Sequence, residues 1–267
     1  MRTLLFAGAL LLMSLAARAE SVTLYAAGSL KAALSDVVGA FERRNGKVRV
    51  DATFAASGLL RERIEKEQAA HVFASADLGH PRRLIDKGLA AAALHVFARN
   101  QLCALAKPGL PVTTATLLDT LLDPTVRVGI STPKADPSGD YAWALFAKAE
   151  AVRPGAQRTL EGKALQLTGG RDSKKAPTGR NQYAWVMDNG EADIFLTYCT
   201  NAVLARRETQ TLQIIQIGPE LSIGAEYGMV VLKNAPQSAD NLARFIMGED
   251  AQKILAEYGF GRGDSSK

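Results

Sequence analysis

Histidine and cysteine are scarce in this chain. The 267 residues include three histidines and two cysteines, Cys103 and Cys199. A structural zinc site normally needs four such ligands at short spacing, so these scattered residues exclude it. The sequence also has no GxSxG or HExxH pattern and no serine turn paired with a nearby histidine, which disfavours an exported hydrolase.

Strong charge and long apolar segments are missing as well. The formal net charge is +5, and it falls to +3 without Arg2 and Arg18, which is too mild to predict nucleic-acid binding. Beyond the N-terminus, no stretch is long and apolar enough to span a membrane. No repeat of solenoid period is present. The length fits one large domain or two of ordinary size.

The first 19 residues have the pattern of a secretory signal peptide. A basic start at Arg2 precedes an apolar run over 4–16, and Ala17-Arg18-Ala19 ends it with small residues. We expect cleavage after Ala19 and a periplasmic mature chain of residues 20–267. No cysteine follows the cleavage site, so a lipid anchor is not expected.

The two cysteines have two possible states. Export permits a disulfide between Cys103 and Cys199, and two buried free thiols are the alternative. A disulfide would close a long loop, which the chain-entropy model credits with roughly 4–5 kcal/mol.

Two strand–turn–helix units near the N-terminus carry a serine in the turn. The first runs from the strand at 22–25 through Gly28 and Ser29, and the second from the strand at 47–54 through Ser57. We predict that Ser29 caps its helix, so that its hydroxyl and the free N–H groups of the first turn face the space beyond the strand. Such a helix N-terminus is an anion-binding site.

Strands and helices alternate along the remaining chain, which predicts a parallel sheet with right-handed crossovers. Further strands are expected at 71–75, 101–106, 127–131, 193–198, 212–217 and 227–233. Helices are expected at 79–88, 116–122, 141–146, 181–190, 202–208 and 238–258, with polar loops at 132–140 and 165–180.

Four stretches follow the order and rough spacing seen in one family: AAGSLKAAL, FAASGLLRERIEKEQAAHVFASAD, NGEADIFLTYCTNA and FIMGEDAQKILAEYGF. Over essentially its whole mature length the chain resembles the periplasmic molybdate-binding proteins of ABC transporters. The resemblance implies an α/β, type II periplasmic binding protein fold, with two α/β lobes joined by a two-strand hinge. Lobe 1 would comprise 20–100 plus 225–267 and lobe 2 would comprise 101–224, with crossings near Gln101–Cys103 and Gly224–Tyr227.

The resemblance also implies five ligand-binding positions. Ser29 and Ser57 match the serines of the two turns, and Ser138 matches a small residue before the Tyr-Ala helix. Arg180 falls where the family usually has an apolar residue that offers its backbone N–H. Tyr198 matches a tyrosine whose hydroxyl contacts the anion. These groups bind the oxygens of molybdate, so no residue is expected to ligate a metal directly.

The function implied is capture of molybdate, and also tungstate, for delivery to an ABC permease and its ATPase. The protein would be a monomer without cofactor or catalytic activity. About seven hydrogen bonds to a charged ligand contribute on the order of 10–20 kcal/mol gross, and micromolar to nanomolar binding needs roughly 8–12 kcal/mol net. Donors alone therefore suffice, and closure of the hinge completes the set of ligand contacts.

Two departures from the family pattern leave alternatives open. His71 stands where the family usually has aspartate, either as a substitution away from the ligand or as a pH-sensitive hinge contact. Arg180 either offers only its N–H or reaches into the cleft, and then the ligand is another oxyanion or a small organic anion. Arg171, Lys174 and Lys175 make that loop basic, which a solvated loop also explains.

Overall fold

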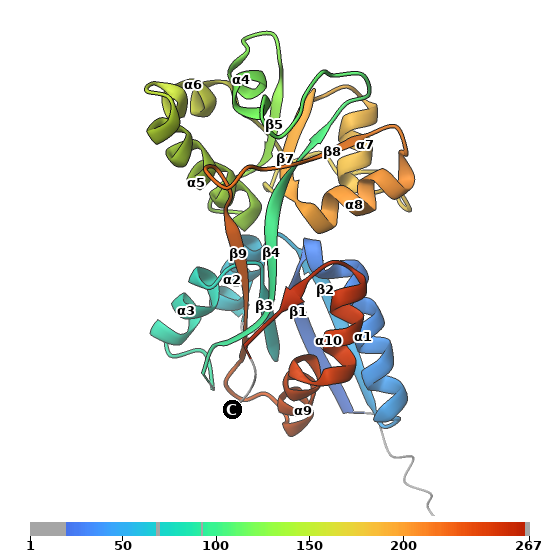
Figure 1. Ribbon diagram of the computed structural model, residues 1–267. Coiled ribbons are helices and arrows are strands. Elements are labelled where there is room, and N and C mark those ends of the chain that lie inside the picture. Colours follow the sequence, from blue (N-terminus) through green and yellow to red (C-terminus); the bar gives the residue numbers. More distant parts are fainter. Residues whose placement is uncertain (1–19, 68–69, 92, 265–267) are drawn as a thin grey trace, which may run out of the picture.

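The computed structural model describes residues 20–67, 70–91 and 93–264, and the predicted signal peptide lies outside them. Two lobes are stacked and joined by two long strands, β4 (His95–Ala106) and β9 (Gly224–Val231) (Figure 1). This arrangement confirms the predicted class of two α/β lobes with a two-strand hinge. In the described part of the chain, no helix has the length and apolarity to cross a membrane.

The lower lobe in Figure 1 contains both serine turns. Its strands are β1 (Glu20–Ala27), β2 (Val48–Ala55) and β3 (Val72–Ser75), and β10 (Gly261–Arg262) pairs with β4. Its helical elements are the 3₁₀ turn η1 (Gly28–Leu30), α1 (Lys31–Arg44), α2 (Ser57–Glu67), α3 (Gly79–Asp86), α9 (Gln237–Met247) and α10 (Glu249–Glu257).

The upper lobe contains the middle of the chain (Figure 1). Its strands are β5 (Val128–Ser131), β6 (Leu165–Thr168), β7 (Ile194–Tyr198) and β8 (Gln213–Gln216). Its helices are α4 (Leu117–Leu122), α5 (Pro137–Val152), α6 (Ala156–Lys163), α7 (Gln182–Asp188) and α8 (Cys199–Glu208).

The hinge strands link the strands of both lobes into one hydrogen-bonded sheet of order β2-β1-β3-β9-β4-β7-β5-β6. Strand β4 pairs with β9 over His95–Gln101, with β7 over Leu102–Ala106 and with β8 over Cys103–Ala106. Both hinge strands are antiparallel to their neighbours, which corrects the predicted all-parallel sheet. The predicted lobe boundaries stay a prediction.

Within each lobe the parallel pairing aligns the strand ends that matter for a site. β1 lies between β2 and β3, with Ala27 opposite Ala55, and all three strands are parallel. β5 lies between β6 and β7 in the same way. Because parallel strands end at a common edge, the turns that follow them gather there.

The two predicted loops are shorter than expected. α5 already begins at Pro137 and β6 occupies the start of 165–180, while α6 lies in a stretch for which no element was predicted. Asp136 caps α5 and Pro137 takes the first helical position, a start signal that the turn-like sequence conceals. β6 is an edge strand of four residues, too short for its alternation of leucine with polar residues to stand out from a loop.

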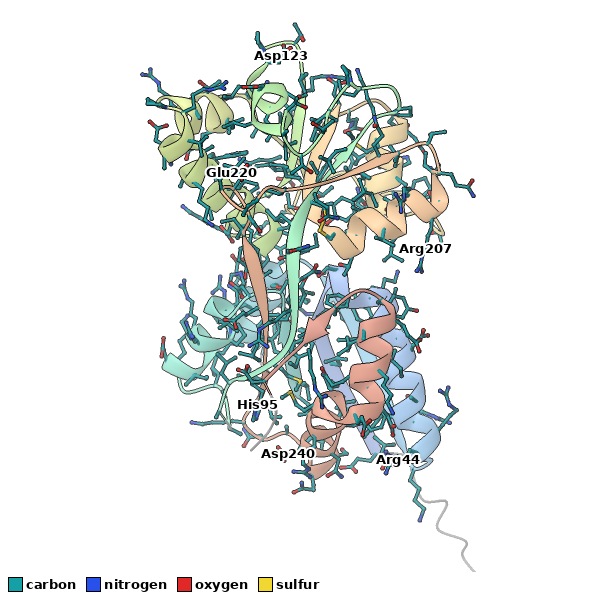
Figure 2. All side chains as sticks on the ribbon, viewed as in Figure 1. Arg44, His95, Asp123, Arg207, Glu220 and Asp240 are labelled. Carbon is teal, nitrogen blue, oxygen red and sulfur yellow. A yellow bond between two sulfur atoms is a disulfide. The ribbon has the colours of Figure 1, made fainter. Side chains whose placement is uncertain are left out.

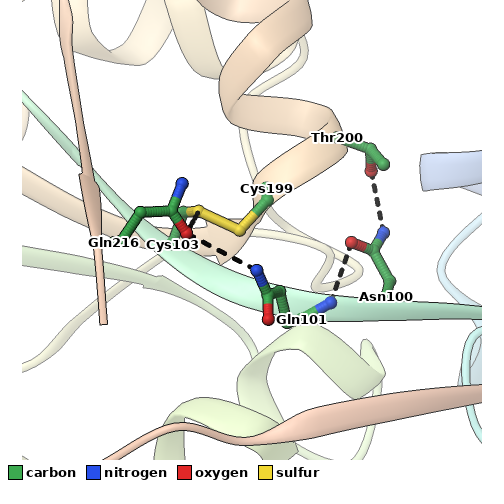
Figure 3. Close-up of a disulfide and its surroundings, with 6 residues drawn as sticks. All are labelled: Asn100, Gln101, Cys103, Cys199, Thr200 and Gln216. Carbon is green, nitrogen blue, oxygen red and sulfur yellow. Dashed lines mark hydrogen bonds between the residues drawn. A yellow bond between two sulfur atoms is a disulfide. The ribbon is translucent and has the colours of Figure 1, made fainter. Parts of the chain in front are cut away.

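The two cysteines are joined in a disulfide, Cys103–Cys199. It ties the first residue of α8 to hinge strand β4, at the base of the upper lobe (Figures 2 and 3). Cys199 follows Tyr198 directly, so the crosslink holds the end of β7 against the hinge.

Candidate functional site

The lower wall of the candidate site is the edge at which β1, β2 and β3 end. Ser29 follows β1, Ser57 follows β2, and Ala76 follows β3. Ala27 lies opposite Ala55 in the strand register, so the two serine turns are neighbours. The predicted pair of serines is therefore brought together.

Ser29 does not cap a helix as predicted. It lies inside the 3₁₀ turn η1, and neither η1 nor α1 has a side-chain capping bond. Its hydroxyl lies 3.0 Å from the hydroxyl of Tyr227 on hinge strand β9. A long-range tyrosine, rather than a local N–H group, thus holds this side chain.

Ser57 is fully buried at the start of α2. Its Oγ accepts a hydrogen bond from the Ala76 backbone N–H at 3.2 Å. An acceptor hydroxyl keeps its own hydrogen for another partner. Ser57 is therefore held in place by one strand end while retaining a donor.

The upper wall is the edge at which β5, β6 and β7 end, together with the start of α5. Ser131 and Thr168 end β5 and β6, and their buried hydroxyls are 2.9 Å apart. Ser138 is fully buried in the first turn of α5, and its hydroxyl has no hydrogen-bond partner among the described residues. Tyr198 ends β7.

Asp136 caps α5 and engages the backbone N–H of Ser138, one of the predicted ligand-binding residues. Its Oδ1 accepts from the Ser138 N–H at 3.0 Å. Gly169, at φ +76°, leaves room for this carboxylate, because a Cβ there would lie 2.5 Å from Oδ2. Burial raises the pKa of Asp136 to about 6. An internal carboxylate thus occupies the place of an anion at this helix N-terminus.

Arg180 is not joined to the other four predicted residues by any contact found among the described residues. Its guanidinium donates to Glu208 at 2.5 Å and to Asp188 at 2.6 Å, and its N–H donates to the Pro177 carbonyl at 3.0 Å. The side chain is partly exposed at this double ion pair. The backbone donor and the charge are therefore both engaged within the upper lobe.

Tyr198 connects the two walls. Its buried hydroxyl donates to the Ala76 carbonyl of the lower wall at 3.4 Å. Burial raises the pKa of Tyr198 well above its ordinary value, so the hydroxyl keeps its proton. The Tyr198 ring centroid lies 5.5 Å from that of Tyr227 and 6.1 Å from that of Tyr141. Aromatic rings thus fill the junction behind the hydroxyls.

The walls touch beside the serine turns. The Gly58 N–H donates to the Ala135 carbonyl at 2.8 Å, and Arg171 forms an ion pair with Glu62. A Cβ at Gly58 would lie 2.7 Å from the Ala135 oxygen. The lobes are therefore in contact, and only glycine at position 58 permits this approach.

Comparison with known sequences identifies the family of this protein. The family model "Bacterial extracellular solute-binding protein" matches residues 22–261. The chain belongs to this family. This membership confirms the expectation of a non-enzymatic binding protein and implies a periplasmic location and an ABC permease with its ATPase as partners.

Individual relatives leave the ligand of this solute-binding protein open. An uncharacterised protein of Pasteurella multocida is 34% identical, with 80% of this chain and 88% of the relative covered. The molybdate-binding protein ModA of Escherichia coli is 28% identical, with 96% of each chain covered. The structure of the sulfate-binding protein SubI of Mycobacterium tuberculosis superposes with a TM-score of 0.71 at 19% identity, covering 90% and 86% of the chains. That structural likeness supports the fold alone.

A pocket between the lobes of the solute-binding protein is lined in part by acidic residues. This pocket of about 360 Å³ is lined by residues of the Asp77 turn, α5 and β9, among them Asp77, Asp140 and Glu226. Three carboxylates repel an anion. The strand-end walls are therefore the better candidate site, although they do not line this pocket. No cluster of metal-binding side chains is found in residues 20–67, 70–91 and 93–264.

His71 lies far from both walls. Its Nδ1 accepts from the Thr23 N–H at 3.0 Å, and its carbonyl accepts from the Leu232 N–H at 2.9 Å. These contacts are at the opposite end of the lower strands from the serine turns, and the chain crosses between lobes elsewhere. They favour the interpretation of His71 as a substitution away from the ligand.

Proposed function

We propose that this solute-binding protein captures a tetrahedral oxyanion, molybdate and also tungstate, between the two walls and delivers it to its ABC permease. The observation that carries the proposal is the juxtaposition of Ser29 and Ser57 at adjacent strand ends. The two serine hydroxyls at these neighbouring turns form a compact donor surface. Such a surface suits a dianion that must be held and then released.

The relatives support this ligand class. The E. coli relative, which covers 96% of the chain, is a molybdate-binding protein. Molybdate, tungstate and sulfate are all tetrahedral dianions. The alternative, an organic anion held by Arg180, loses its motivation because that guanidinium is engaged by Asp188 and Glu208.

Closure of the lobes follows from where the donors lie. The anion binds first to the lower wall, and the upper lobe then closes over it with Tyr198 and the Gly58–Ala135 hydrogen bond. A ligand favours the closed state only by the contacts that the open state lacks. The protein thus signals its loaded state to the permease by shape.

Thermal melting of the 20–267 protein with molybdate, tungstate, sulfate or phosphate tests the proposal. A ligand at 100 times its Kd stabilises the native state by about 2.7 kcal/mol. For a chain of this size that corresponds to a rise in Tm of about 5–10 °C. We expect this rise with molybdate and tungstate and a smaller one with sulfate. A rise with sulfate or phosphate alone would change the ligand, and no rise with any of the four would refute the proposal.

A further inference from the structure

A chain of side-chain hydrogen bonds runs from the upper lobe through the hinge to Ser29. Thr200, in α8, accepts from Asn100 Nδ2 on β4 at 2.8 Å. Asn100 Nδ2 also donates to the hydroxyl of Tyr227 on β9 at 3.4 Å, and that hydroxyl lies 3.0 Å from Ser29 Oγ. Figure 3 shows the Thr200–Asn100 end of this chain beside the disulfide.

The direction of these bonds is fixed by a backbone group. Asn100 Oδ1 accepts from the Gln101 N–H at 2.9 Å, and a backbone N–H can only donate. The oxygen of the amide is thereby assigned, and both hydrogens of Nδ2 are directed to Thr200 and Tyr227. The Tyr227 oxygen accepts, so its own hydrogen is available to Ser29.

Tyr227 keeps that hydrogen under all ordinary conditions. The residue is fully buried, and burial raises the pKa of its hydroxyl well above the usual value. Its ring packs against Tyr198, Phe97 and Phe260, which leaves the side chain little freedom. When Tyr227 donates to Ser29, the hydrogen of Ser29 is left for the ligand.

We propose that Tyr227, oriented by Asn100, is a positioning residue that sets Ser29 as a hydrogen-bond donor toward the bound anion. The inference rests on the proposed function, since it concerns the ligand held at Ser29. It also describes the ligand: the atom that faces Ser29 must be able to accept a hydrogen bond, as every oxygen of molybdate or sulfate can.

Replacement of Asn100 by aspartate reverses the chain without changing its shape. A carboxylate cannot donate, so Tyr227 would donate to position 100 and Ser29 would have to donate to Tyr227. The hydrogen of Ser29 would then point away from the ligand. We expect Asn100→Asp to raise the Kd for molybdate at pH 7.5 by at least about tenfold, the cost of one hydrogen bond to a charged group.

A double-mutant cycle separates this effect from the added negative charge. Tyr227→Phe removes the link and leaves Ser29 free to rotate, so a smaller loss of about threefold to fivefold is expected. In the Tyr227→Phe background, Asn100→Asp changes only the charge, and its effect should be clearly smaller than in the wild type. Tyr25→Phe, which removes a hydroxyl elsewhere in the lower lobe, is the matched control and should bind normally.

Titration calorimetry of the four variants and the wild type gives the decision. A smaller fold-change in Kd from Asn100→Asp in the Tyr227→Phe background than in the wild type supports the proposal. The same fold-change in both backgrounds overturns it. If the wild type binds none of the four oxyanions, the proposed function itself has failed. An NMR contact between the Tyr227 hydroxyl proton and the Ser29 β-protons of the ligand-free protein is expected as well. Its absence from an otherwise assigned spectrum would also overturn the direction of the chain.

Discussion

The two walls of the candidate site use their hydrogen-bond donors differently. In the lower wall, Ser57 accepts from the chain and retains its own hydrogen for a ligand. In the upper wall, the N–H of Ser138 is bound by Asp136, and elsewhere in the upper lobe the N–H of Arg180 is bound by a carbonyl. Asn181 caps the start of α7 in the same manner. The lower wall is thus prepared to bind, and the upper wall is largely satisfied without a ligand.

This difference suggests a division of roles between the lobes. A preorganised donor surface can bind an anion before closure, and most of the binding free energy then arises in the lower lobe. The upper lobe contributes through the contacts that close the hinge, such as Tyr198 with Ala76. If the upper wall could also bind the anion by itself, the open state would hold the ligand on either wall and would be poorly defined.

The largest expected effect comes from the carboxylate of the upper wall. Asp136 has its pKa raised to about 6 by burial, above the usual value of about 3.9 for an unfolded chain. The folded state therefore binds the proton more tightly, and stability falls as pH rises from about 4 to about 6. Asp136→Asn keeps an acceptor for Ser138 and removes this dependence. Above pH 7 the variant should be more stable by up to about 3 kcal/mol.

Urea unfolding of Asp136→Asn and of the wild type between pH 4 and 8 measures this difference. The neighbouring Asp140 is present in both proteins, and its charge adds to the effect of burial on the pKa of Asp136, so the difference between the curves includes this repulsion. If the free energies of unfolding of the two proteins change with pH in parallel, ionisation of Asp136 does not destabilise the folded state. The electrostatic difference between the two walls would then be absent.

The serines test the contrast directly. Ser29→Ala removes a donor to a charged ligand, which should weaken molybdate binding by about 1.5–3 kcal/mol, or roughly tenfold to 150-fold. Ser138→Ala is the matched change in the upper wall, and it removes a buried hydroxyl that has no partner among the described residues. We expect it to change the Kd by less than about threefold. If calorimetric titration finds equal losses of affinity for Ser29→Ala and Ser138→Ala, the Ser138 hydroxyl binds the ligand and the two walls do not differ in this respect.

The lower wall was largely predictable because its signals are local. Ser29 and Ser57 each follow an apolar strand and precede a helix, and strand register alone makes them neighbours. Asp136 also has a local signal, since aspartate before proline is a frequent helix start, although the neighbouring Pro and Gly residues favour a loop.

Long-range contacts of the candidate site could not have been found in this way. Tyr227 and Ser29 are 198 positions apart, and a tyrosine in an apolar strand reads as a core residue. The ion pairs of Arg180 likewise depend on side chains of α7 and α8 that tertiary packing brings together. Contacts of this kind become visible only with the fold.

A smaller effect is expected from the contact between the walls. Gly58→Ala places a methyl group against the backbone at Lys134 and Ala135, closer than van der Waals contact allows. Helix α2 itself should tolerate the change, because alanine is a better helix former than glycine. Molybdate binding should weaken by about tenfold if closure supplies about 1.4 kcal/mol. Small-angle scattering with saturating ligand should show a more extended protein than the wild type, and an unchanged radius with unchanged Kd would show that closure adds nothing.

The smallest effect is expected at Arg180, and it separates the two ligand hypotheses. Its guanidinium pairs with Asp188 and Glu208 at a partly exposed position, where an ion pair contributes about 1 kcal/mol or less. Arg180→Ala should therefore lower stability slightly and change the Kd for molybdate by less than about twofold. A large loss of affinity would require the side chain to leave both carboxylates and turn to the ligand. The upper wall would then provide a positive charge in the closed state, and the assignment of binding free energy mainly to the lower wall would have to be reversed.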